Sequence, residues 1–538
     1  MENPVDLVFL NGPVFTSDPH RPWATGVAVK DSSIVAVGHS NEIEPHIGQD
    51  TEVVDLKGRL MVAGFQDAHV HPITAGLDRI RCDLLESGGL AEGLERIRRY
   101  RAGTPGTAWV RGGGWKFNWF EGGRAPVELL DELVPDRPAY LAVTDGHAGW
   151  ANSRALELAG VDSVTPDPPD GRIERKPDGS PQGTLQEGAM DLVERVLPAN
   201  TEDELAQGLL EAQSYLFSHG ITAWQDAWVT TELHDTYRRL AADGRLLAQV
   251  RGALWWERQQ GLEQLDLMEE QRAQSVPGYQ AGSIKLMLDG VCENFTARML
   301  EPYLAVDGSS TDNLGIDFID PAALAEIVTE IVRRGFQPHF HALGDAAVRG
   351  ALEAVAVARD RLGYTDVRPH IAHLQVVHPD DIPRFASVGA AANAQALWAC
   401  SDHTTQVLTE PFLGAERSTH QYPFGDLVRS GAHLAMGSDW AVSTPDVMEQ
   451  IAVAVTRKVP GEPDSEPYLP HQRLSLEDAL IGFTAGSAYV NFLEVSRGVI
   501  QPGKVADLAV LEANPFEDGP AGMQVDLTFV AGRTVFQR

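Results

Sequence analysis

The sequence predicts an α/β fold: a (β/α)8 barrel, a composite β-sandwich domain built from both termini, and an insertion after the first barrel strand. Three observations support this prediction. The 538 residues exceed the size at which one hydrophobic core usually stops growing, so a large domain with a smaller companion is expected. Short apolar runs alternate with helical stretches through the middle of the chain, and both ends carry only short runs rich in Val, Ile and Leu.

The two ends of the chain have the pattern of short β-strands. Runs such as DLVFL, GVAVK and SIVAVG fall within residues 1–60 and are separated by turn signals. The segment 491–538 repeats this pattern with ADLAVLE, LTFVAG and RTVFQ. Because the termini of a domain often lie close together, the two segments are expected to combine into one β-sandwich.

Residues 61–490 carry the pattern of a (β/α)8 TIM barrel. Alternating strands and helices indicate β/α units around a parallel sheet, and eight such units close into a barrel. The eight candidate strands begin near residues 62, 220, 248, 282, 336, 367, 389 and 432. The first two are separated by far more residues than a crossover helix needs, so an insertion at about 75–215 is expected to cover the barrel mouth.

The composition excludes several classes of function. The chain has 76 acidic and 43 basic side chains and a formal net charge of −33, which would repel nucleic acid and anionic membrane surfaces. No stretch approaches the ~20 apolar residues of a membrane span, and the N-terminal segment lacks the basic region of a signal peptide. The expected partner is therefore a small-molecule substrate, and the expected location is the cytoplasm. A homodimer is left open.

The three cysteines argue against thiol chemistry. Cys82, Cys292 and Cys400 lie far apart in the sequence and form no C-x-x-C pair. Neither a disulfide framework nor a thiolate zinc site is therefore indicated, and a reducing interior suits these residues.

The stretch GFQDAHVHP (64–72) places two histidines at the end of the first barrel strand. Side chains two residues apart face the same side of a strand, so His69 and His71 project together above Asp67. At the carboxyl end of a barrel strand, two imidazoles on one side can share a metal ion. Taken alone, however, H-x-H is more often a pair of hydrogen-bonded histidines in a core.

Histidines on two further strands strengthen the metal interpretation. In FQPHFHALGD, His339 and His341 face the interior; His341 is nearer the mouth and the better ligand, whereas His339 lies one layer deeper as a packed or supporting residue. In VRPHIAHLQ, His370 and His373 are three residues apart, so they face opposite sides of a strand and at most one points inward. Periodicity does not choose between them.

A lysine and an aspartate complete the candidate site. In GSIKLMLD the alternation turns Lys285 inward, where an ammonium group must be neutralised, paired or modified. One interpretation is an ordinary salt bridge with Asp67 or Asp226. In HLAMGSDW, Asp439 closes the last strand, where its carboxylate could touch both a metal and a water molecule. Nitrogen and oxygen donors without thiolate suit zinc and would also accept manganese, iron or cobalt.

These motifs resemble those of the amidohydrolase superfamily, and the chain is identified as a member of its YtcJ-like branch of metal-dependent hydrolases, amidohydrolase family 3. GFQDAHVHP is similar to the family's first-strand motif, HFHALGD to its fifth, HIAHLQ to its sixth and GSDW to its eighth. The segment GVIQPGKVADLAVLEANP is similar to the one that returns the chain to the β domain. Ala372 departs from the family, which often has Glu before the sixth-strand histidine, but the ligand itself is in place.

The resemblance implies a site for one or two divalent metal ions, with zinc as the expected metal. Its implied ligands are His69, His71, Lys285, His341, His373 and Asp439. The first histidine pair and the aspartate would hold one ion and the two later histidines the second, which favours His373 over His370. Lys285 occupies the position of a carboxylated lysine that bridges the two metals in many relatives, and carbamate formation would turn the buried cation into an anionic ligand.

The expected reaction is hydrolysis of a carbon-nitrogen bond other than a peptide bond, in an amide, an N-formyl amine or an N-acyl amine. A metal-activated hydroxide would attack the carbonyl, and Asp439 would accept the proton of the water and deliver it to the leaving nitrogen. The alternatives are a metal-dependent isomerase, a phosphoester hydrolase or a non-catalytic scaffold on the same barrel, because function depends on the site and not on the fold.

Three residues are candidates for substrate binding: Trp115, His147 and Trp440. Trp115 follows a Gly-rich turn, and His147 lies in TDGHAGWANSRAL, which resembles a stretch common in this branch. Tryptophans at barrel rims are often structural, which is the alternative for Trp440. Asn152 or Ser153 is expected to cap the helix that follows.

Overall fold

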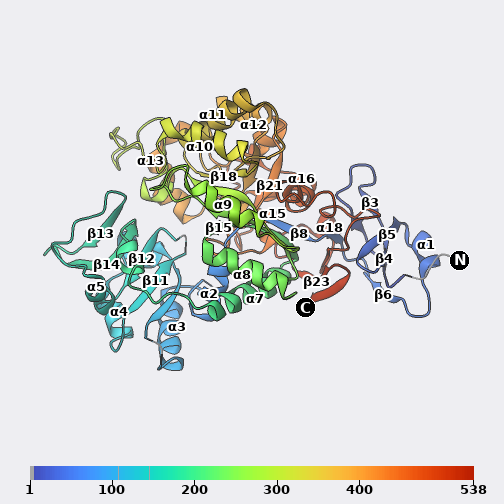
Figure 1. Cartoon of the computed structure of the whole chain (residues 1–538), viewed down its shortest axis with the longest axis horizontal. Coiled ribbons are helices and arrows are strands. Elements are labelled where there is room, and N and C mark those ends of the chain that lie inside the picture. The colour runs from blue at the N-terminus through green and yellow to red at the C-terminus, as the bar shows by residue number, and fades with distance from the viewer. Residues whose placement is uncertain (1–4, 86, 107, 145) are drawn as a thin grey trace. The chain divides into compact units, whose positions relative to one another are not determined.

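A computed structural model describes residues 5–85, 87–106, 108–144 and 146–538 (Figure 1). The first four residues of the predicted N-terminal β segment lie outside this description. The chain forms two compact units. The first comprises Met1–Val70, Ser214–Ser438 and Pro445–Arg538, and the second comprises His71–Gln213 and Asp439–Thr444.

An eight-stranded parallel sheet forms the centre of the first unit. Its strand order is β8-β15-β16-β17-β18-β19-β20-β21, so each strand pairs with the next one along the chain, as in a (β/α)8 barrel. The strands are β8 (Phe65–Val70), β15 (Ile221–Val229), β16 (Gln249–Trp255), β17 (Tyr279–Met287), β18 (Gln337–Ala342), β19 (His370–His373), β20 (Ala391–Ala394) and β21 (Leu434–Met436). All eight predicted barrel strands are confirmed.

Hydrogen bonds from the last two strands reach the first strand and bring the sheet close to a complete barrel. Ser438, just after β21, donates its backbone N–H (3.1 Å) and its hydroxyl (2.5 Å) to the Asp67 carboxylate. Asn393 of β20 donates its side-chain amide to the carbonyl of Ala68 (2.9 Å). The predicted barrel is therefore confirmed, and Asp67 has a structural role at its closing edge.

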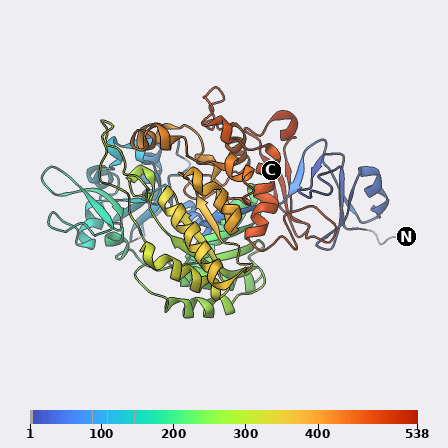
Figure 2. The same ribbon diagram turned by 90° about the horizontal axis from the view of Figure 1, so that it is seen from above.

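The helices that follow these strands pack outside the sheet (Figure 2). They are α8 (Thr231–Ala242), α9 (Gln264–Ala273), α10 (Pro321–Arg333), α11 (Asp345–Leu362), α12 (Ile382–Val388), α13 (Glu410–Ser418), α14 (Phe424–Arg429), α15 (Val447–Thr456), α16 (Leu476–Ile481) and α17 (Ser487–Val490). Helix α10 begins with Asp320, whose side chain caps it by accepting the N–H of Ala322, and a proline suits its first turn. Leu324, Val328 and Ile331 then form one buried stripe at helical spacing.

Two further sheets in the first unit form the β domain, and the six-stranded one contains strands from both ends of the chain. One has the order β5 (Ser33–Gly38), β4 (Gly26–Lys30), β1 (Leu7–Leu10) and β6 (Glu52–Asp55). The other has the order β24 (Arg533–Gln537), β23 (Val525–Val530), β22 (Leu508–Leu511), β7 (Met61–Ala63), β2 (Val14–Phe15) and β3 (Trp23–Ala24). Phe9 and Phe529 pack edge-to-face at 5.0 Å in the shared core, which confirms the predicted composite β domain.

The run VAGFQDAHVH, predicted as one strand, forms two. β7 pairs with β22 in the sandwich, whereas β8 pairs with β15 in the barrel. Gly64 separates them at a close approach, because a Cβ atom there would lie 2.5 Å from the hydroxyl of Thr222. One short segment therefore links the β domain directly to the strand that carries His69.

The second unit contains its own mixed sheet, in the order β13 (Gly171–Arg175), β14 (Pro181–Glu187), β12 (Ala148–Ala151), β11 (Ala139–Val143), β10 (Val110–Trp115) and β9 (Cys82–Asp83). Its helices include α2 (Pro72–Ile80), α3 (Leu90–Gly103), α4 (Val127–Leu133) and α5 (Ser153–Ala159). Asn152 caps α5 by accepting the N–H of Ala155 (3.0 Å), as predicted. The insertion after the first barrel strand is confirmed, while its numerical bounds and its place over the mouth stay predictions. Within the described ranges, no helix combines the length and hydropathy that crossing a membrane requires.

Candidate metal centre

Strand β8 carries the first candidate ligand into the barrel interior. His69 is buried, and its backbone N–H donates to the Asp67 carboxylate (2.9 Å). Its Nδ1 lies 2.8 Å from Nε2 of His339, and its Nε2 lies 3.3 Å from Nζ of Lys285. The imidazole therefore presents one nitrogen to a deeper layer of the barrel and the other to Lys285.

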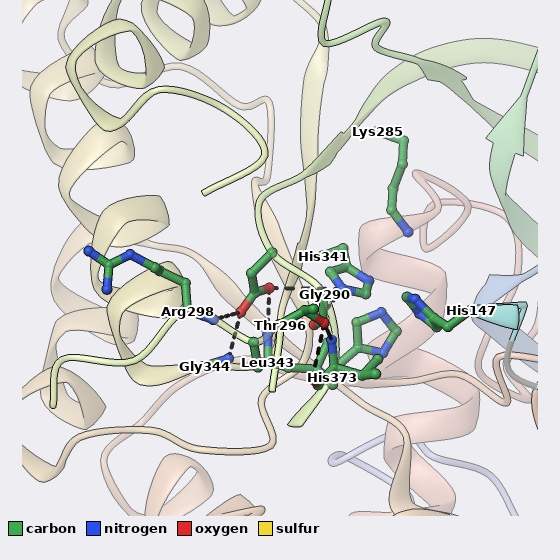
Figure 3. Close-up of polar contacts among 12 residues, drawn as sticks. His147, Lys285, Gly290, Thr296, Arg298, His341, Leu343, Gly344 and His373 are labelled. Carbon is green, nitrogen blue, oxygen red and sulfur yellow. Dashed lines mark hydrogen bonds and ion pairs between the residues drawn. The ribbon is translucent and has the colours of Figure 1, made fainter. Parts of the chain in front are cut away.

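Three more predicted residues of the first unit gather beside this histidine. Lys285 of β17, His341 of β18 and His373 of β19 are buried, and their side chains converge in Figure 3. The ring centroid of His373 lies 4.7 Å from that of His69 and 4.5 Å from that of His341. The parallel register of neighbouring strands thus brings four predicted ligands to one end of the barrel.

Both histidines of β19 face the interior, which corrects the expectation from strand periodicity. His370 forms hydrogen bonds with Gln225 and Asn393, both at 3.0 Å, inside the barrel. His373 has a φ of +78°, and its N–H donates to the side-chain oxygen of Gln395 (2.7 Å). Because this left-handed backbone breaks the alternation of sides at the strand end, a spacing of three residues no longer separates the two imidazoles.

His71 and Asp439, both of the second unit, form a close pair. Nε2 of His71 lies 3.0 Å from Oδ1 of Asp439, and the N–H of His71 donates to the carbonyl of Trp440 (2.8 Å). His69, His71 and Asp439 each offer one ligand atom, and these atoms lie within 4.8 Å of one another. Two imidazoles and a carboxylate at this separation fit a divalent ion such as zinc.

A buried carboxylate that the sequence did not single out lies behind His341. Oδ1 of Asp289 is 3.8 Å from Nε2 of His341. The Asp289 carboxylate also accepts the N–H groups of Leu343 (3.1 Å), Gly344 (2.8 Å) and Arg298 (2.9 Å); these three donors are labelled in Figure 3. Burial raises the pKa of Asp289 to about 7, against the lowering effect of these hydrogen bonds. The position of Asp289 just after β17, in LMLDG, is the sequence feature that could have indicated this residue.

The two acids considered as salt-bridge partners of Lys285 each accept hydrogen bonds from other residues. Asp226 accepts the hydroxyl of Tyr237 on α8 (2.7 Å). Asp67 accepts the N–H and hydroxyl of Ser438. Lys285 lies beside His69, a position that a role within the metal centre requires, and both the salt bridge and the carboxylation stay predictions.

The three predicted substrate-binding residues have different surroundings. Trp115 is fully buried in the core of the insertion, where its N–H donates to a backbone carbonyl (2.9 Å) and its ring packs edge-on against Trp150 (6.4 Å). Nδ1 of His147 lies 3.0 Å from a carboxylate oxygen of Glu187. Trp440 is buried. Contact with substrate stays a prediction for all three, and Trp115 has a packing role as well.

A (β/α)8 barrel with imidazole and carboxylate donors at its strand ends is typical of metal-dependent hydrolases. Residues 52–536 match the Amidohydrolase family, and the chain belongs to that family. A Bacillus subtilis (strain 168) protein with the provisional name amidohydrolase YtcJ is 28% identical over 99% of each chain, which confirms the likeness to the YtcJ-like branch.

Two further relatives extend the comparison. N-substituted formamide deformylase of Arthrobacter pascens is 27% identical over 99% of this chain and 98% of its own. The crystal structure of an uncharacterized metal-dependent hydrolase from Pyrococcus furiosus has the same fold, with a TM-score of 0.72 and 24% identity over 95% of this chain and 99% of that one. The family match and the shared fold therefore agree with the barrel architecture described above.

Proposed function

We propose that this protein hydrolyses the C–N bond of an N-substituted formamide or a related N-acyl amine. The observation that carries the proposal is the group His69, His71 and Asp439, whose ligand atoms lie within 4.8 Å of one another. The similarity to the Arthrobacter pascens protein, named as a deformylase of N-substituted formamides, supports the choice of bond. The products would be a carboxylic acid, formate in the simplest case, and an amine.

The proposed metal ligands are the six residues predicted from the sequence: His69, His71, Lys285, His341, His373 and Asp439. A divalent ion bound there would lower the pKa of water toward neutrality and polarise the substrate carbonyl. The imidazole-rich donor set supports zinc, and one or two ions per chain are proposed. Carboxylation of Lys285 would remove the cost of a buried cation, and its Nζ already lies 3.3 Å from Nε2 of His69.

Asp439 is proposed to move the proton. Asp439 is 4% exposed, and its carboxylate lies 3.0 Å from Nε2 of His71, so its position is fixed by a second proposed ligand. In the hydrolysis, the oxygen of water joins the carbonyl carbon and the C–N bond breaks. The Asp439 carboxylate would hold the proton that water loses and pass it to the leaving nitrogen, so that the product leaves as a neutral amine.

A substrate panel with zinc-loaded protein tests this proposal. We expect release of amine from N-substituted formamides or N-acyl amines, and its loss in Asp439→Asn. Asp464→Asn, which changes an exposed aspartate in the same way, is the matched control and should keep the activity. Turnover of aryl phosphoesters alone would overturn the C–N assignment, and no turnover of any substrate would favour a non-catalytic role.

Location and assembly belong to the same proposal and stay predictions. We expect a cytoplasmic protein with no nucleic-acid partner. Cell fractionation checks the location, and size-exclusion chromatography with light scattering checks whether a homodimer forms.

A further inference from the structure

A continuous hydrogen-bond network crosses the barrel interior below the candidate metal centre. Its members come from five strands: Gln225 (β15), Arg251 (β16), Gln337 and His339 (β18), His370 (β19) and Asn393 (β20). All except Arg251 are fully buried. Buried polar groups must pair, and the direction of a hydrogen bond can be assigned wherever one partner can only donate or only accept.

The amide of Gln337 is oriented by groups of known polarity on both sides. Its Nε2 lies 2.8 Å from the carbonyl of Arg368 and 2.9 Å from that of Val490, and these oxygens can only accept. Its Oε1 lies 3.0 Å from Nε of Arg251, and a guanidinium can only donate. Oε1 of Gln337 is therefore the acceptor at this point of the network.

The orientation of the Gln337 amide determines that of the Gln225 amide. Nε2 of Gln225 lies 3.3 Å from Oε1 of Gln337, so it donates, and Oε1 of Gln225 points the other way. That oxygen lies 2.8 Å from Nδ1 of His339 and 3.0 Å from Nε2 of His370. Because a carbonyl oxygen can only accept, each of these ring nitrogens carries a proton.

A second, independent anchor gives the same result for His370. Nδ2 of Asn393 donates to the backbone carbonyl of Ala68 at 2.9 Å, which orients this amide. The same Nδ2 lies 3.0 Å from Nδ1 of His370, so Nδ1 accepts and the proton of a neutral ring sits on Nε2. Burial, with Lys285 and Arg251 nearby, lowers the pKa of His370 to about 3, which keeps the ring neutral.

We infer that Gln225 and His339 are positioning residues that hold His69 in the tautomer a metal ligand needs. His339 carries its proton on Nδ1, so in the neutral ring Nε2 accepts, and Nδ1 of His69 donates to it at 2.8 Å. The lone pair of His69 is then on Nε2, the nitrogen that faces Lys285. Ligand histidines are commonly oriented by an acceptor that receives the N–H of the ring nitrogen away from the metal. For His69 this acceptor is the imidazole of His339, which the amide of Gln225 orients in turn.

The inference rests on the proposed metal centre but not on the substrate, and the wild-type protein tests it directly. Nitrogen-15 NMR of histidine-labelled, metal-free protein at pH 8, with the His69 signals assigned by their loss in His69→Gln, reports which ring nitrogen carries the proton. We expect a protonated Nδ1 and an unprotonated Nε2. A proton on Nε2 of His69 would overturn the inference.

Variants of His339 test its consequence for metal binding. His339→Phe removes the acceptor, and the affinity for Zn²⁺, measured by competition with a chromophoric chelator, should fall about 10–100-fold. His339→Gln places an amide oxygen near the position of Nε2 and should recover most of the affinity. Phe340→Leu changes a buried neighbour on the opposite side of β18 and should bind zinc as the wild type does.

The outcomes separate this inference from the proposed function. If folded His339→Phe binds zinc as tightly as the wild type, the inference is wrong even where a C–N bond is cleaved. If zinc affinity follows the expected order while no C–N substrate is turned over, the proposed function fails and the positioning role stands.

Discussion

Removal of the Asp67 carboxylate is expected to open the barrel between its last strand and its first. In Asp67→Ala, three buried donors lose an acceptor: the N–H of His69, the N–H of Ser438 and the hydroxyl of Ser438. An unsatisfied buried donor costs about 1–3 kcal/mol. The hydroxyl can rotate toward another acceptor, which leaves two unsatisfied N–H groups and an expected loss of about 2–6 kcal/mol, a large share of the roughly 5–15 kcal/mol that stabilises a typical domain.

Urea unfolding of the metal-free protein, followed by tryptophan fluorescence, measures this loss. The metal is removed because an ion that binds only the folded state would stabilise it independently. Ser438→Ala is the matched comparison, since it removes only the hydroxyl bond and should cost about 1 kcal/mol. If Asp67→Ala unfolds at the same urea concentration as Ser438→Ala, the account of barrel closure is wrong.

Three further predictions concern the site and the network below it. Asp439→Asn should lower kcat by about 10²–10⁴-fold in steady-state assays while mass spectrometry finds the metal content retained; a wild-type kcat would contradict the proton-transfer role. Because burial lowers the pKa of His370 to about 3 and an unfolded histidine titrates near ~6.5, the unfolded state binds more protons between these values. The contribution of His370 to the free energy of unfolding is therefore fully present above the pKa of the unfolded histidine. It falls by up to about 1.4 kcal/mol per pH unit as the pH drops toward ~3. In urea titrations between about pH 3 and 7, the free energy of unfolding should depend less steeply on pH in His370→Gln than in the wild type. Equal slopes would count against a neutral buried ring. A chelator should lower the Tm and added zinc should restore it, whereas a Tm indifferent to both would argue against a metal centre.

The barrel could be predicted from the sequence because the two sides of its strands differ in chemistry. In β17 and β18 the inward positions include Lys285, His339 and His341, while Phe340 and Leu286 face the other way. Alternation of this kind reports which side of a strand faces the interior. The same periodicity placed His339 one layer below His341, where its ring contacts His69.

Backbone departures from regular strand geometry could not be predicted in the same way. Periodicity separates His370 from His373, but the left-handed backbone of His373 returns both to the interior. The roles of Gln225 and Asn393 depend on partners in strands distant in the sequence, so a single strand's pattern carries no information about them. Asp289 lies beyond the end of β17, outside the range where alternation applies.

Titration of zinc into the metal-free protein in the presence of an N-substituted formamide tests whether cleavage of the C–N bond depends on the bound metal. Amine release should be absent without metal, should rise with bound zinc and should reach its maximum at one or two ions per chain. Equal turnover by the metal-free protein, or saturation with zinc without cleavage of any C–N bond, would contradict the proposed metal-dependent hydrolysis.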